Sequence, residues 1–220
     1  VRDWMVLARA DNPLEWKSLR VMVTGASGFV GRNLMFNAHA AVDGVFEHPL
    51  NDYKSVQVSK VIHDFYETDE TRGFYGGGGI DARPLWSATP IFHAIMGMPH
   101  DVPGWGAEWK AEIAHNFTRQ MTLASGTTSL ALDRNNITLD PNNTDQWGRP
   151  AIRATYRDHD DDLAIARFLS ERSQELMDAA GATKYWAHEI KPSDNGVHLL
   201  GTARMGDDPK TSVIDRYHRR

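Results

Sequence analysis

One histidine near the C-terminal end of the sequence has surroundings that suit proton transfer. His198 stands between apolar residues, and a series of small residues follows it, among them Gly201 and Gly206. Small residues let backbone or a flat ligand approach closely. A partly buried imidazole without a neighbouring carboxylate stays neutral near pH 7 and can accept a proton. We therefore expect a partly buried His198 that is either a general base or a hydrogen-bonded loop histidine, and spacing alone favours the loop histidine.

A second pattern is the glycine-rich turn at residues 21–31, Val-Met-Val-Thr-Gly-Ala-Ser-Gly-Phe-Val-Gly. A strand followed by glycines and a helix N-terminus can bind the pyrophosphate of a dinucleotide. Gly25, Gly28 and Gly31 would form that turn, and Asp43 lies near the position of a ribose-binding carboxylate. The stretch resembles the opening of extended short-chain dehydrogenases and sugar-nucleotide epimerases, which implies an NAD(P)-dependent reductase or epimerase.

Other parts of the sequence do not support a nicotinamide enzyme. Those enzymes carry a Lys four residues after a catalytic Tyr, and none of the tyrosines here is followed by Lys at that distance. The downstream sequence also lacks the alternation of strands and helices that a doubly wound sheet requires. A structural glycine turn and a contact with a different cofactor stay open beside NAD(P) binding.

The segment 198–215, H-L-L-G-T-A-R-M-G-D-D-P-K-T-S-V-I-D, closely resembles the C-terminal signature of the glucose–methanol–choline (GMC) oxidoreductase family. Residues 27–35, S-G-F-V-G-R-N-L-M, and the region 136–150, which begins N-I-T-L-D, resemble two further motifs of that family in the same order. A helix with an acidic start at 161–180 falls where the family places one. The resemblance covers residues 27–220 and leaves residues 1–26 unassigned.

This resemblance implies an FAD-dependent enzyme that oxidises the CH–OH group of an alcohol, most similar to enzymes of sugars and sugar acids. The hydride would pass to N5 of FAD, while His198 would accept the hydroxyl proton. The implied partners are a small-molecule alcohol and an electron acceptor such as oxygen, a quinone or a cytochrome. One departure is Asn37, which stands where relatives often carry His.

The resemblance also predicts a fragment of a two-domain flavoprotein, truncated at both ends. The family places its FAD-binding βαβ unit ahead of the matched region and a second catalytic His or Asn after it. We therefore expect residues 27–220 to form the substrate-binding and C-terminal region, and the chain alone to be inactive and to bind FAD weakly or not at all. A non-catalytic domain that uses aromatic loops for protein contact is a third hypothesis.

The mix of short strands, one long amphipathic helix and long loops predicts an α+β fold with an antiparallel sheet. The clearest helix is 161–180, because apolar residues recur at helical spacing, Asp160 to Asp162 can cap its start and Gly181 can end it. The run Gly76–Gly79 predicts an exposed loop or a close approach of backbone, and the proline-rich stretch 84–106 predicts long connections. Further helices are expected at 32–40 and 107–116, and strands at 19–24, 41–46, 55–62, 117–132, 136–140, 152–156 and 185–190.

The composition excludes several classes of protein. With 24 Lys plus Arg against 29 Asp plus Glu, the formal net charge of the 220 residues is −5, which argues against nucleic-acid binding. The absence of cysteine excludes disulfides, thiolate metal sites and a cysteine nucleophile. No apolar run is long enough to predict a transmembrane helix, and no metal site is expected. The composition does not indicate a compartment.

Overall fold

The computed structural model describes residues 31–84, 89–193 and 198–219, which fall into two compact units. The sheet unit consists of residues 37–129 and 159–192. The hairpin unit consists of the described residues within 1–36, 130–158 and 193–220. In the described part of the chain, no helix combines the length and the apolar character that a bilayer-spanning helix needs. The strand expected at 19–24 lies outside the described residues.

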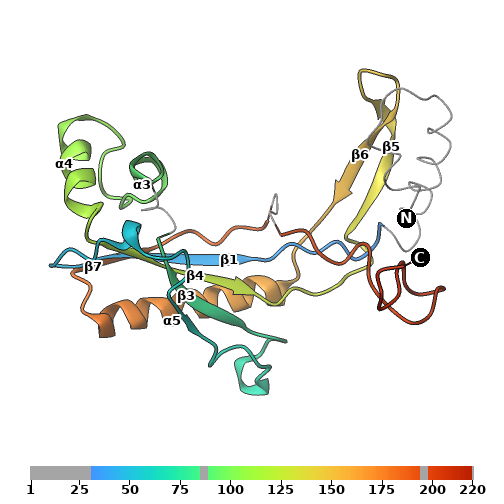
Figure 1. Ribbon diagram of the computed structural model, residues 1–220, viewed down its shortest axis with the longest axis horizontal. Coiled ribbons are helices and arrows are strands. Elements are labelled where there is room, and N and C mark those ends of the chain that lie inside the picture. Colours follow the sequence, from blue (N-terminus) through green and yellow to red (C-terminus); the bar gives the residue numbers. More distant parts are fainter. Residues whose placement is uncertain (1–30, 85–88, 194–197, 220) are drawn as a thin grey trace. The chain divides into compact units, whose positions relative to one another are not determined.

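The sheet unit contains a five-stranded antiparallel sheet in the order β2-β3-β4-β1-β7 (Figure 1). This architecture confirms the predicted α+β class with an antiparallel sheet. Of the strand expected at 55–62, only the last three residues form a strand. Of the strand expected at 117–132, only the central part does. The strands are β1 His39–Val45, β2 Lys60–Ile62, β3 Gly78–Arg83, β4 Gln120–Thr127 and β7 Lys184–Ala187.

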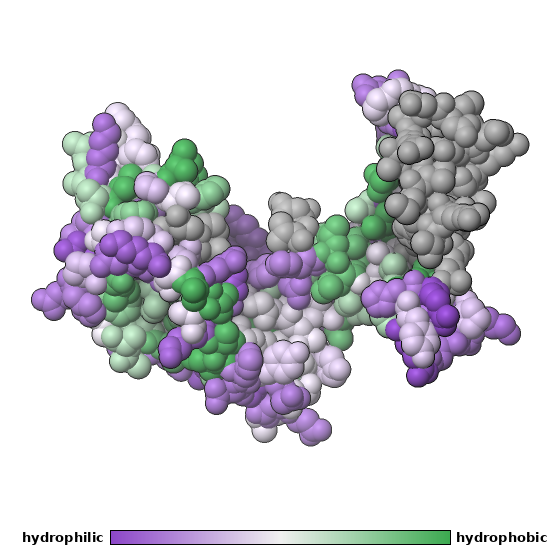
Figure 2. Space-filling view, in the orientation of Figure 1, coloured by the Kyte–Doolittle hydropathy of each residue, from purple (hydrophilic) through white to green (hydrophobic). Residues whose placement is uncertain are grey.

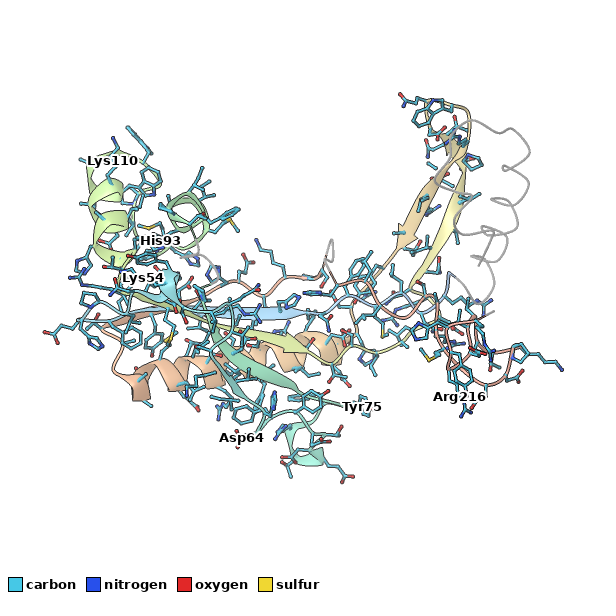
Figure 3. All side chains as sticks on the ribbon, in the orientation of Figure 1. Lys54, Asp64, Tyr75, His93, Lys110 and Arg216 are labelled. Carbon is cyan, nitrogen blue, oxygen red and sulfur yellow. The ribbon has the colours of Figure 1, made fainter. Side chains whose placement is uncertain are left out.

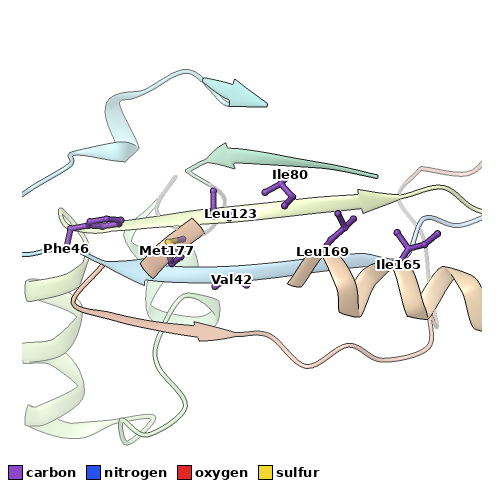
Figure 4. Close-up of a cluster of buried hydrophobic side chains, with 7 residues drawn as sticks. All are labelled: Val42, Phe46, Ile80, Leu123, Ile165, Leu169 and Met177. Carbon is purple, nitrogen blue, oxygen red and sulfur yellow. The ribbon is translucent and has the colours of Figure 1, made fainter. Parts of the chain in front are cut away.

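One face of this sheet is covered by the helix α5, Asp160–Ala180. Successive residues of a strand point to opposite faces, so alternate apolar residues of the central strands meet the apolar stripe of the helix. Burial of these side chains provides the main core of the unit (Figure 4). The core residues are Val42, Phe46, Ile80, Leu123, Ile165, Leu169 and Met177.

The ends of α5 follow the sequence prediction with one correction. Gly181 ends the helix in the left-handed conformation at φ 81°, as expected. The N-cap is His159 rather than the aspartate cluster. Its ring nitrogen Nδ1 accepts a hydrogen bond from the backbone N–H of Asp161 at 3.1 Å, and the Asp162 carboxylate accepts one from the backbone N–H of His159 at 2.9 Å. The carboxylate therefore reaches back to the cap, which makes a capping box.

The run Gly76–Gly79 is not an exposed loop, so that prediction is wrong, and the alternative of a close backbone approach is confirmed. A Cβ atom at Gly77 would lie 2.0 Å from the carbonyl oxygen of Phe65, and one at Gly78 would lie 2.4 Å from that of Gly126. Gly76 to Gly78 are buried, and β3 begins at Gly78. The glycines are there because no side chain fits between these backbones.

The connection 84–106 contains a helix that the sequence analysis missed, α3 at Pro90–Met96. The hydroxyl of Thr89 accepts a hydrogen bond from the backbone N–H of Phe92 at 3.4 Å, and Pro90 occupies the first turn, where proline is tolerated. The helix buries the polar side chain of His93 and exposes its large apolar residues, which Figure 2 shows as hydrophobic surface over α3. The exposed residues are Ile91, Phe92, Ile95 and Met96.

Three short helices and a hairpin complete the described structure. The predicted helix at 107–116 is α4, Gly106–Asn116, and two 3-10 turns lie at Asp52–Lys54 and Glu70–Arg72. In the hairpin unit, β5 (Asn136–Thr144) pairs with β6 (Pro150–Thr155), as expected for strands there. The register of β5 against β6 shifts between Leu139 and Thr144.

Candidate functional site

His198 lies in the hairpin unit, next to a segment that pairs with the N-terminal part of the described chain. The backbone N–H of Met35 donates to the carbonyl of Leu200 at 3.0 Å, and the N–H of Leu200 donates to the carbonyl of Met35 at 3.2 Å. This reciprocal pair is the pattern of an antiparallel bridge. It brings residues 31–35, the described part of the motif at 27–35, beside the motif that begins at His198.

The third motif lies on the other side of the same segment. The N–H of Ile137 donates to the carbonyl of Gly31 at 2.7 Å, and the N–H of Leu34 donates to the carbonyl of Asn135 at 3.0 Å. Residues 31–35 therefore form backbone hydrogen bonds to both other motif segments. The helix predicted at 32–40 is wrong for this reason, because long-range partners satisfy the backbone groups that a helix would satisfy internally.

Two residues with positive φ make this close arrangement possible. Gly201 has φ 88°, and a Cβ atom there would lie 2.0 Å from the carbonyl oxygen of Asn33, which itself has φ 62°. The side-chain amide of Asn33 donates to Asp133 Oδ1 at 3.1 Å. Its own Oδ1 is buried and has no hydrogen-bond partner among the described residues. Asn33 therefore keeps an unused acceptor beside the segment that follows His198.

We predict that Gly201→Ala destabilises this arrangement by about 1–3 kcal/mol, because alanine is strained at this φ and its Cβ meets backbone. Gly148→Ala is the matched control, since Gly148 has φ 75° but has open space around it. Urea unfolding of both variants measures the difference. If Gly201→Ala costs no more than Gly148→Ala, the close contact with Asn33 does not contribute.

The imidazole of His198 is exposed, so the expectation of a partly buried histidine is wrong. The neighbouring leucines do not enclose it, because Leu199 and Leu200 are themselves 61% and 47% exposed. His198 and the two leucines that follow it in sequence are therefore all exposed at the surface of the unit.

The residues of the nicotinamide hypothesis are not arranged for it. Gly25 and Gly28 lie outside the described residues, and the carbonyl of Gly31 is used by Ile137. Asp43 belongs to the sheet unit, where it is fully buried on β1. Thr122 donates its hydroxyl to the Asp43 carboxylate at 2.5 Å, and His188 Nε2 lies 2.6 Å from the other oxygen. A carboxylate in this position is closed to a ribose.

A buried carboxylate that the sequence analysis did not single out holds the chain ahead of His198. Asp158 is nearly fully buried in the hairpin unit. It accepts hydrogen bonds from the hydroxyl of Tyr156 at 3.1 Å and from the backbone N–H of Ser193 at 2.5 Å. The sequence offered little signal for it, because Asp158 stands beside the aspartates that read as a helix cap.

The chain after His198 folds into a compact loop. Met205 and Ile214 form a parallel bridge, and the Asp208 carboxylate accepts a hydrogen bond from the backbone N–H of Lys210 at 2.8 Å. A shallow, open depression there is lined by Met205, Gly206, Asp207 and Arg216. Arg216, labelled in Figure 3, pairs with Asp207 at 2.8 Å, so the depression has little net charge.

A second carboxylate stabilises the end of this loop. The backbone N–H of Arg219 donates to Asp215 at 3.0 Å, and this bond lowers the pKa of the Asp215 carboxyl. The N–H of Tyr217 donates to the same oxygen at 2.8 Å. The loop is therefore held by its own aspartates.

Comparison with known proteins finds a family match over this part of the chain. Residues 131–219 match the GMC oxidoreductase family. The chain is 29% identical over 199 residues to the 2-methyl-1,2-propanediol dehydrogenase of Mycolicibacterium austroafricanum, which covers 89% of this chain and 36% of that protein. It is 26% identical over 205 residues to the gluconate 2-dehydrogenase flavoprotein of Pantoea cypripedii, covering 86% and 32%.

A shorter match concerns the paromamine 6'-oxidase of Streptomyces fradiae. It is 36% identical over 75 residues, which is 34% of this chain and 14% of that protein. The chain thus spans about a third of the length of the first two relatives and less of the third.

Proposed function

We propose that the chain carries the catalytic base of an alcohol-oxidising flavoprotein. Residues 131–219 match the GMC oxidoreductase family, and the chain is distantly similar to two dehydrogenases over most of its length. In this proposal His198 accepts the hydroxyl proton as the CH–OH group of the substrate becomes a carbonyl. The observation that supports it most is the convergence of the three motif segments, 31–35, 135–137 and 198–201, in one unit. We further propose that residues 27–220 form the substrate-binding and C-terminal region.

The family is FAD-dependent, and bound FAD would supply the hydride acceptor. The chain's own residues would set the position of the base. The two hydrogen bonds between Met35 and Leu200 fix the backbone two residues beyond His198. Asp158 holds Ser193, five residues ahead of it. Backbone held close to His198 would limit where the imidazole can lie, which favours proton transfer in one geometry.

The described residues around His198 fit one side of a flavin. Leu199 and Leu200 present apolar surface for a flat ring, and Asn33 Oδ1 is a buried acceptor with no partner among the described residues. A flavin ring carries both apolar edge and N–H groups, so these residues and His198 are the ones we propose to contact it.

We propose a polyhydroxyl alcohol as substrate, with a sugar or sugar acid favoured. The relatives are named for a diol, for gluconate and for an aminoglycoside, which share hydroxyl-bearing carbons. The electron acceptor in this proposal is a quinone, a cytochrome or oxygen. The nicotinamide alternative is not retained, because Asp43 is buried and already bonded.

A chimera tests the proposal. This chain replaces the matching stretch of the Pantoea cypripedii flavoprotein, and bound flavin is measured by its visible absorption. We expect anaerobic addition of gluconate, 2-methyl-1,2-propanediol or glycerol to bleach that absorption, and NAD(P)⁺ to remain unreduced. A flavin-loaded chimera that none of the three alcohols reduces, under conditions where the parent enzyme is reduced by gluconate, contradicts the proposal.

A further inference from the structure

A buried hydrogen-bond network in the hairpin unit is centred on Asp158, whose side chain is almost completely inaccessible to solvent. One carboxylate oxygen accepts from the hydroxyl of Tyr156 at 3.1 Å, and the other accepts from the backbone N–H of Ser193 at 2.5 Å. The Tyr156 hydroxyl also lies 3.2 Å from the carbonyl oxygen of Phe36, to which it can donate instead. The network therefore joins three segments that are far apart in the sequence.

All three segments are ends of the pieces that make up the hairpin unit. One piece ends at Phe36, the next runs from residue 130 to Asp158, and the last begins at Ser193. The end of a piece has fewer neighbours along the chain within its own unit to hold it in place. A hydrogen bond at that point removes conformational freedom that the chain otherwise keeps.

The position of Asp158 is itself fixed from the residues beside it. The buried side-chain amide of Asn135 donates to the carbonyl of Arg157 at 3.1 Å and accepts from the N–H of Arg157 at 3.0 Å. The ring of Tyr156 stacks on the ring of Phe36, with centroids 4.1 Å apart. A residue that positions another must be held in place by its own surroundings, and these contacts meet that condition.

His198 lies between two anchored points of one stretch of chain. Ser193, five residues ahead of it, is held by Asp158, and Leu200, two residues after it, is held by its two hydrogen bonds with Met35. A segment tied at both ends samples fewer positions than one tied at a single end. Loss of the Ser193 bond would therefore widen the range of positions open to the imidazole.

We propose that Asp158 is a positioning residue for His198, an inference that rests on the proposed function. Asp158 is buried and both of its oxygens have partners, so it acts through the chain and not by contact with substrate or flavin. Misplacing a catalytic group by about 1 Å can cost roughly 10²-fold in rate. Loss of the Asp158 carboxylate should therefore slow the chemical step and leave substrate binding largely unchanged.

The proposed role needs a hydrogen-bond acceptor at this position and does not need a negative charge. In Asp158→Asn, the amide oxygen can still accept from the N–H of Ser193. The amide NH₂ group can donate to the hydroxyl oxygen of Tyr156, whose proton then goes to the carbonyl of Phe36. In Asp158→Ala the acceptor is lost. Comparing the two variants therefore separates positioning through a hydrogen bond from an effect of charge.

The test is anaerobic flavin reduction in the chimera with the Pantoea cypripedii flavoprotein, at increasing concentrations of whichever of the three alcohols reduces it fastest. The limiting rate reports the chemical step, and the half-saturating concentration reports binding. We expect Asp158→Ala to lower the limiting rate about 10–10²-fold and to change the half-saturating concentration by less than about threefold. Asp158→Asn should stay within a factor of a few of the unmodified chimera.

Asp145→Ala is the matched control. The Asp145 carboxylate also accepts backbone hydrogen bonds in the hairpin unit, from the N–H groups of Trp147 and Arg149, and none from the segment that leads to His198. A general loss of stability would slow both alanine variants, whereas positioning slows only Asp158→Ala. If the Asp158→Ala chimera does not fold and retain flavin, Ser193→Pro takes its place, because proline lacks the N–H that the carboxylate binds.

A double variant shows whether Asp158 acts through His198. Adding Asp158→Ala to His198→Ala should cause no further slowing, because the group to be positioned is already absent. Further slowing of similar size overturns the inference, as does an Asp158→Ala chimera reduced as fast as Asp145→Ala or an Asp158→Asn chimera as slow as Asp158→Ala. These three results leave the proposed function standing. A His198→Ala chimera that is reduced at the full rate overturns both.

Discussion

Replacing His198 by alanine is expected to slow flavin reduction about 10²–10⁴-fold in the chimera with the Pantoea cypripedii flavoprotein, because removal of a general base in the rate-determining proton transfer has this effect. The side chain is exposed and its backbone neighbours are fixed by the Met35–Leu200 pair. The substitution should therefore leave the fold unchanged, and the flavin bound by each variant is measured by its visible absorption. Stopped-flow reduction under anaerobic conditions measures the rate.

His218→Ala is the matched control for this prediction. His218 is another exposed histidine in the loop that follows His198, and it lies outside the motif. We expect its reduction rate to stay within a factor of a few of the unmodified chimera. A His198→Ala protein that keeps its flavin and is reduced as fast as His218→Ala would remove His198 from the mechanism.

The sequence predicted elements whose signals are local and missed those that depend on distant partners. Helix α5 was predicted almost to the residue because its apolar stripe and the glycine at 181 are both visible in the sequence. Residues 32–40 were predicted as helix and are not helical, since Leu34 and Met35 bond to Asn135 and Leu200 and His39 begins β1. No local pattern reports hydrogen bonds across a hundred residues.

The glycine run and α3 are two further cases in which the local sequence pattern suggested the wrong structure. Four consecutive glycines suggest a loop. Here they let the backbones of two neighbouring segments approach closely, and the sequence does not show which segments those are. The prolines at 84, 90, 99 and 103 suggested an irregular connection. For this reason α3 was not predicted, although Pro90 lies in its first turn. Proline excludes a helix interior and not a helix start.

The candidate site was partly accessible from sequence. The motif at 198–215 singled out His198, and the collinear motifs named the segments that the structure brings together. Their mutual pairing and the exposure of His198 were not predictable, because both depend on which chain lies next to Leu200. In β4, the sequence itself shows Gln120 and Thr122 alternating with apolar residues.

Leu169→Ala is the second substitution with a large expected effect, this time on stability. Leu169 is fully buried at the centre of the cluster between α5 and the sheet. Its methyl group packs directly over Gly78, so closely that a Cβ atom there would lie 2.7 Å from it. Removing the side chain leaves a cavity in a tightly packed region, which we expect to cost about 2–5 kcal/mol. That is a large part of the roughly 5–15 kcal/mol that stabilises a typical domain.

Urea unfolding followed by circular dichroism measures this loss, with Arg167→Ala as the control on the same helix. Arg167 is exposed, and its replacement should change stability by no more than about 0.5 kcal/mol. Adding Gly78→Ala to Leu169→Ala should not restore stability, because the new methyl group meets the carbonyl oxygen of Gly126 at 2.4 Å whether or not Leu169 is present. A Leu169→Ala protein as stable as Arg167→Ala would mean that α5 does not pack on the glycine run, and a double variant that recovers stability would mean that β3 and β4 can separate there.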